Sequence, residues 1–177
     1  MSYKIDIYEH SENNSMRFLL GTIGLKPLIA VGLNPSTADD IEPDMTISKI
    51  IGFASRNNFD SFLMLNLYPQ KTKFPDELDI EIDLAKHQLN LSKISYKLKE
   101  YSEINLLASW GAPILKRDYL MHCLIDLNNK LSDLKINWLQ IGDFTKSGHP
   151  RHPSRAKYSS GLRSFDFTNY IKTFHND

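Results

Sequence analysis

The chain has 177 residues, of which 41% are hydrophobic and 24% are charged. These proportions are typical of a globular protein. The length predicts a single domain over residues 1–177, with a core large enough to be stable without covalent cross-links. Cys123 is the only cysteine, which excludes a disulfide framework and favours a reducing, cytoplasmic location. The longest apolar stretch, residues 18–33, is interrupted by Lys26 and Pro27, so we expect no membrane span, and no signal-peptide pattern precedes it.

Positive charge is concentrated in one segment although the formal net charge is zero. Between residues 143 and 163, Asp143 is the single acid beside five cations, which are Lys146, Arg151, Arg155, Lys157 and Arg163. His149, His152 and Tyr158 are interleaved with these cations, a composition that suits contact with a nucleic-acid backbone. A solvated loop that serves only solubility is the alternative interpretation.

Short apolar runs alternate with helical patterns along the chain. Residues 1–25 predict an edge hairpin or N-terminal extension, with loosely alternating strands at 3–9 and 17–23. Four runs predict buried strands, at residues 28–32, 61–65, 104–108 and 136–141. Four segments with apolar residues every three or four positions predict helices, at residues 46–56, 84–101, 115–131 and 165–174. Because strands that alternate with helices favour parallel pairing, the predicted fold is α/β, a three-layer α/β/α domain with a central, mostly parallel four-stranded sheet.

Polar residues follow three of the predicted strands. The motif Gly32-Leu33-Asn34-Pro35-Ser36 ends the first strand, Asn66 ends the second, and His152-Pro153-Ser154 lies in the basic loop after the last. Loops at the carboxyl ends of strands form the ligand crevice of open α/β sheets. We therefore expect Asn34, Asn66 and His152 to meet at one edge of the sheet.

Structural roles for these residues remain open. Asn34 could satisfy backbone groups in its own turn, and Asn66 could cap the turn that follows its strand. Phe53 and Tyr68 are candidate stacking platforms, but an aromatic residue beside Ile50 is also typical of a core.

A metal site is not expected at the two histidines of the basic loop. His149 and His152 could form a pair, but Pro150 and Pro153 break helical spacing and no third ligand is nearby. We predict no metal and no other cofactor.

Both motifs resemble those of the uracil-DNA glycosylase superfamily, over roughly residues 28–160. Residues 32–35 match the Gly-x-Asn-Pro first motif of its mismatch-specific branch, and residues 152–154 match the His-Pro-Ser second motif of other branches. Residues 65–69 look like the strand end that supplies a base-recognising asparagine, and residues 106–111 occupy the place of the penultimate strand.

A narrower similarity involves residues 34–39, Trp110-Gly111 and residues 148–153. These segments are similar to a family of small bacterial and phage proteins described only as a domain of unknown function. This similarity indicates family membership and implies no particular activity.

Two departures from the superfamily change the substrate that the resemblance implies. Uracil-removing members have an aspartate where this chain has Asn34, and a tyrosine that blocks pyrimidine C5 substituents where this chain has Ser36. The smaller Ser36 leaves room for a methyl, hydroxymethyl or larger group. Branches with an iron–sulfur cluster are excluded, because one cysteine cannot hold a cluster.

The resemblance thus implies a monofunctional DNA glycosylase that flips a C5-substituted pyrimidine, hydroxymethylated or glucosylated forms included, out of DNA and leaves an abasic site. Asn34 would orient a water, and His152 would donate a hydrogen bond to the leaving base. The implied substrate-binding residues are Gly32, Pro35, Ser36, Phe53, Asn66 and Tyr68, with Asn66 as the reader of the base edge. The implied DNA-binding residues are Lys146, Arg151, Ser154, Arg155, Lys157 and Tyr158, with Tyr158 or Arg155 as the wedge.

Anti-phage defence and base-excision repair both suit such an enzyme. Two alternatives belong to other classes, namely a non-catalytic nucleic-acid-binding module and an N-glycosidic hydrolase of free nucleosides or nucleotides. DNA is the expected partner, and the chain is expected to act as a monomer.

Overall fold

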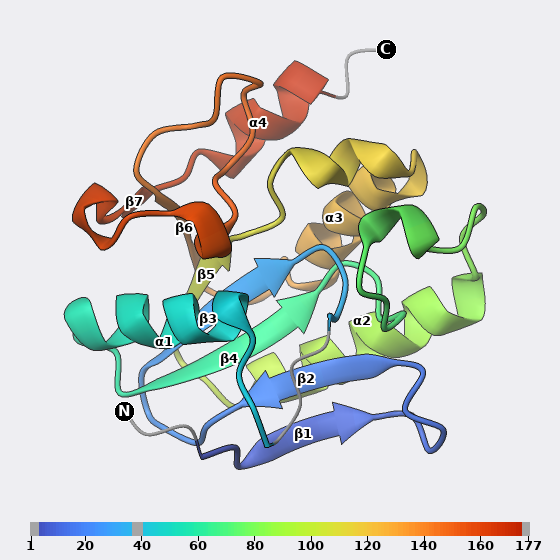
Figure 1. Cartoon of the computed structure of the whole chain (residues 1–177), viewed down its shortest axis with the longest axis horizontal. Coiled ribbons are helices and arrows are strands. Elements are labelled where there is room, and N and C mark those ends of the chain that lie inside the picture. Colours follow the sequence, from blue (N-terminus) through green and yellow to red (C-terminus); the bar gives the residue numbers. More distant parts are fainter. Residues whose placement is uncertain (1–3, 37–40, 175–177) are drawn as a thin grey trace.

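A single mixed sheet organises the part of the chain that the structure describes, residues 4–36 and 41–174 of a computed structural model (Figure 1). The strand order is β1-β2-β4-β3-β5-β6-β7. The strands are β1 (Ile7–His10), β2 (Arg17–Gly21), β3 (Pro27–Gly32), β4 (Ser61–Asn66), β5 (Ile104–Ala108), β6 (Ile136–Ile141) and β7 (Leu162–Ser164). The α/β class is therefore confirmed.

The sheet is larger and less parallel than the sequence predicts. The predicted strands become β3, β4, β5 and β6, which pair in parallel. The hairpin β1–β2 is antiparallel and joins the edge of β4, and β7 folds back antiparallel onto β6. Half of the six pairings are thus antiparallel, and the prediction of a mostly parallel four-stranded sheet is wrong in strand number and in proportion.

Helices cover both faces of this sheet (Figure 1). The helices in the described residues are α1 (Met45–Arg56), α2 (Leu84–Leu98), α3 (Tyr119–Lys130) and α4 (Phe167–Phe174). Alternate residues of a strand face opposite sides, so β3 contributes Leu28 and Ala30 to the core under α1. Its residues Ile29 and Val31 pack instead in the core under α2, α3 and α4. All six residues of β3 are buried, as expected for a parallel strand covered on both faces.

Short 3₁₀ turns shape the connections at the carboxyl edge of the parallel strands. They are η1 (Pro75–Glu77), η2 (Ala112–Lys116), η3 (Pro153–Arg155) and η4 (Tyr158–Ser160). A proline stands at the start of η1, η2 and η3, where its missing N–H costs no hydrogen bond. Within residues 4–36 and 41–174, none of the helices combines the length and the apolar character that a membrane crossing requires.

Candidate functional site

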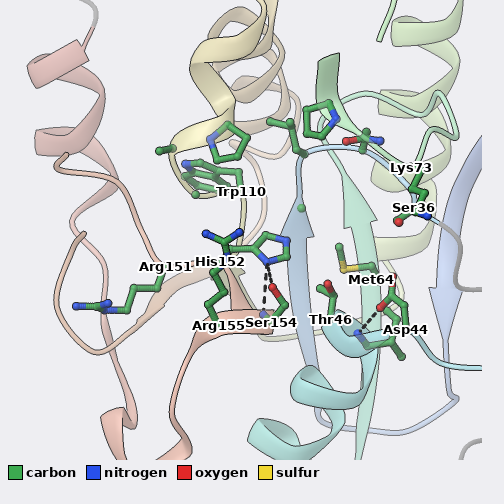
Figure 2. A pocket seen from close by; sticks show the side chains of 18 of the residues that line it. Ser36, Asp44, Thr46, Met64, Lys73, Trp110, Arg151, His152, Ser154 and Arg155 are labelled. Atoms are coloured by element: carbon green, nitrogen blue, oxygen red, sulfur yellow. Dashed lines mark hydrogen bonds between the residues drawn. The ribbon is translucent and has the colours of Figure 1, made fainter. Parts of the chain in front are cut away.

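A cavity of about 480 Å³ lies where the loops after β3, β5 and β6 meet the start of α1 (Figure 2). Its walls also include Thr72, Lys73 and Pro75, together with Arg17 of β2 and Met64 of β4. Among the predicted site residues, those that line it are Gly32, Asn34, Ser36, Arg151, His152, Ser154 and Arg155. The structure therefore brings the two sequence motifs together, as predicted from their places after parallel strands.

One ring nitrogen of His152 is fixed by its own loop, and the described residues make no hydrogen bond to the other. It is the N-cap of η3, and its Nδ1 accepts the Ser154 N–H at 3.4 Å and pairs with the Ser154 hydroxyl at 2.8 Å (Figure 2). Since Nδ1 is an acceptor, the proton of the neutral ring is on Nε2. Burial lowers the pKa of His152; Asp44 opposes this effect and Arg155 adds to it. His152 is therefore a neutral donor at neutral pH.

The Asn34 amide is fixed by the loop that faces it. Its Nδ2 donates to the backbone oxygens of Pro35 and Thr72 and to Thr72 Oγ1, each at 3.0 Å. Thr72 N–H in turn donates to Pro35 O at 3.0 Å. Because these bonds occupy the donor end of the amide, Asn34 can offer a ligand only the acceptor Oδ1.

Trp110 and Gly111 follow the end of β5 and form the wall beside His152. Trp110 is fully buried, and its Nε1 donates to the Tyr170 hydroxyl oxygen at 3.1 Å. That hydroxyl lies 2.9 Å from Nδ1 of buried His149. Because a tryptophan N–H can only donate, the Tyr170 O–H is left to donate to His149. This chain of bonds ties β5 to α4 and to the basic loop.

His149 does not act with His152. Its ring stacks on Phe174 at 4.5 Å between centroids, and burial lowers its pKa. Burial also raises the pKa of Tyr170 to about 12. The two histidines thus belong to separate environments, one in the core and one at the cavity.

Three predicted substrate contacts are core residues. Asn66, Phe53 and Tyr68 are fully buried and absent from the cavity lining. The Asn66 amide is satisfied when its nitrogen faces the backbone oxygens of Asn34 and Leu65, at 3.1 and 3.3 Å. It therefore supports the Asn34 turn and has no free edge with which to read a base.

Phe53 and Tyr68 are likewise occupied by packing. Phe53 lies under α1, against the edge of Tyr158, with ring centroids 5.1 Å apart. The Tyr68 hydroxyl donates to the Asp79 carboxylate at 2.9 Å and accepts the Asp83 N–H at 3.1 Å, and burial raises its pKa. Pro35 is buried and also stands outside the lining.

The basic loop divides between the cavity and the surface. Arg151 and Arg155 line the cavity and are exposed, whereas Lys146 and Lys157 are exposed without lining it. Tyr158 lies beneath two cations of α1, with Lys49 Nζ 4.4 Å and Arg56 Cζ 3.9 Å from its ring centroid. Tyr158 therefore fastens the loop to α1 and is not available as a wedge.

Comparison with known proteins places the chain in a family. The model of a family described as "Protein of unknown function (DUF1643)" matches residues 17–154. The chain belongs to the DUF1643 family. The match runs from Arg17 to Ser154 and so includes both motifs, which confirms the predicted similarity to a family of unknown function. No curated protein and no solved structure matches. Nothing in these comparisons links the DUF1643 family to uracil-DNA glycosylases.

Three charged residues of this DUF1643 protein line the cavity although they are not among the predicted site residues. They are Arg17, Asp44 and Lys73. Arg17 is buried in β2, and an arginine inside an apolar strand is a signal that could have been found. Asp44 was predictable only as the cap of α1. Of the described lining residues, four are cationic and Asp44 alone has a carboxylate.

Proposed function

We propose that this DUF1643 protein is a monofunctional DNA glycosylase that removes a C5-substituted pyrimidine from DNA and leaves an abasic site. One observation supports the proposal above all others. His152 and Asn34, from loops far apart in the sequence, line the same cavity, and the described residues make no hydrogen bond to the His152 Nε2 donor or to the Asn34 Oδ1 acceptor. The proposal also assigns the chain the fold of the uracil-DNA glycosylase superfamily. Four parallel strands with helices on both faces support this part of the proposal.

His152 would act on the leaving base. When the glycosidic bond breaks, its electron pair moves onto the base, which becomes negatively charged. The Ser154 contacts hold the ring so that the Nε2 proton can meet that charge. A preorganised donor of this kind contributes roughly 3–4 kcal/mol to transition-state stability.

Asn34 would hold the attacking water. Its Oδ1 accepts a hydrogen bond from the water, which then captures the oxocarbenium-like sugar. Thr72 and Pro35 fix the amide, so this acceptor costs little reorganisation during the reaction. Lys73 is the one lysine among the described residues that line the cavity, and its Nζ lies over the Phe74 ring, 5.4 Å from the centroid. We therefore propose base removal without strand cleavage.

The size and charge of the cavity suit a flipped, modified base. Its volume of about 480 Å³ falls within the range of roughly 300–1,000 Å³ typical of pockets for drug-sized ligands. Ser36 lines it where a bulkier side chain would fill space. Arg151 and Arg155 can bind the phosphates beside the extruded nucleotide. Both anti-phage defence and base-excision repair remain suitable settings for this activity.

The test is incubation with single- and double-stranded oligonucleotides that contain uracil, mismatched thymine, or hydroxymethylated or glucosylated pyrimidines. Alkaline scission then reveals abasic sites. We expect scission of at least one modified substrate, and a loss of about 10²–10³-fold in rate for His152→Ala with DNA affinity retained. If the wild-type protein binds these DNAs but none is cut, the chain is a binding module.

A hydrolase of free nucleotides is a second candidate, which the position of two cations favours. Arg17 and Lys73 line the cavity itself, where they would lie near a single phosphate. Affinity that depends only weakly on salt, together with release of a base from nucleotides, would support this candidate over the DNA enzyme.

A further inference from the structure

We propose that Asp44 is the general base of the reaction, the group that removes a proton from the attacking water. The inference rests on the proposed function and assigns a residue that neither sequence motif contains.

A base is needed because Asn34 cannot serve as one. An amide does not accept a proton at neutral pH, and the Asn34 nitrogen is already bonded to Pro35 and Thr72. His152 is assigned to the leaving base. It cannot also take the proton, since Nδ1, its one unprotonated nitrogen, faces Ser154. Asp44 is the one carboxylate among the described residues that line the cavity.

The carboxylate is held in place by the helix that follows it. Asp44 is the N-cap of α1, and its Oδ1 accepts the Ile47 N–H at 2.9 Å. The described residues donate no hydrogen bond to its Oδ2, so that oxygen is available to a water. Figure 2 shows Asp44 and Thr46 on the α1 side of the cavity and His152 with Ser154 on the other side.

Asp44 and His152 also interact electrostatically across the cavity. The carboxylate raises the pKa of His152, an effect smaller than the opposing effect of burial. A ligand between them would therefore have a hydrogen-bond donor at one end and a carboxylate at the other. The same negative charge would stabilise the positive charge that develops on the sugar.

The reaction then balances. The bond between C1′ and the base nitrogen breaks, and its electron pair leaves with the base, which accepts a hydrogen bond from His152 Nε2. The water oxygen bonds to C1′ and transfers one proton to Asp44. That proton passes to solvent, and the released base takes one proton from solvent, so the net reaction consumes one water.

Asp44→Asn separates this catalytic role from the capping role. Asparagine caps helices as well as aspartate does, so α1 and the cavity should keep their shape while the proton acceptor is lost. We expect the single-turnover rate of base release to fall by about 10²–10⁴-fold, with DNA affinity and the unfolding temperature little changed. Asp44→Ser, which also caps, should give the same result.

Asp83→Asn is the matched control. Asp83 caps α2 through the N–H groups of Ala85 and Lys86 and does not line the cavity. This variant should release base at the wild-type rate. If Asp44→Asn is as fast as wild type while His152→Ala is inactive, the inference is wrong and the proposed function stands. If the wild-type protein releases no base from any substrate, both are wrong.

Discussion

At the residue scale, the donor role of His152 depends on Ser154. The Ser154 hydroxyl lies 2.8 Å from Nδ1, and the Ser154 N–H at 3.4 Å is the weaker of the two contacts. Ser154→Ala should therefore loosen the ring and slow base release by up to about tenfold, since one such hydrogen bond is worth roughly 0.5–1.5 kcal/mol. Ser154→Thr keeps the hydroxyl and should retain most of the rate. Single-turnover kinetics measure both effects, and equal rates for alanine and serine would contradict this role.

Also at the residue scale, the sequence predicted the cavity residues that lie in loops, Asn34 and His152, better than Asn66, which lies within a strand. Asn34 and His152 lie in loops, and the parallel pairing of β3, β5 and β6 brings those loops to the same end of the sheet. Asn66 is the last residue of β4, and it is fully buried although Gly32 and Met64 line the cavity. A Cβ on Gly32 would lie 3.1 Å from the side-chain amide of Asn66, which shows how closely that backbone covers the amide. The residues next to Asn66 in the sequence give no sign that a neighbouring strand buries its amide.

At the element scale, the turn after β5 needs glycine to approach the His152 loop. Gly111 has φ +65°, and a Cβ there would lie 3.4 Å from His152 Cβ. Gly161 has the same φ with nothing within 4 Å, which makes it a matched control. Both alanine variants should lose about 1–3 kcal/mol of unfolding free energy through backbone strain. Only Gly111→Ala should also slow base release, and urea unfolding with single-turnover assays separates the two effects. Equal rates for both variants would show that this turn does not position His152.

Also at the element scale, the length of a repeating pattern decided what could be predicted. The four inner strands are mostly apolar, and α1 through α4 have apolar faces, so each was expected near its observed bounds. β7 has only three residues, of which two are exposed, and it exists because β6 offers a free edge. The helix predicted from residue 115 begins at Tyr119, because η2 precedes it and uses Pro113 in a tighter turn.

At the scale of the whole molecule, a net charge of zero makes DNA binding depend on where the cations gather. Each phosphate contact to duplex DNA contributes about 0.9 to the slope of log affinity against log salt. Replacing Arg155 and Lys157 by alanine should therefore reduce that slope by up to about two.

Lys99→Ala should leave this slope unchanged, since Lys99 follows α2 and leads toward the amino end of β5, away from the cavity. Fluorescence anisotropy between about 50 and 200 mM salt, in a His152→Ala background, measures the slope without turnover. An unchanged slope in the double variant would mean that the loop contacts no phosphate chain and would favour a free nucleotide as substrate.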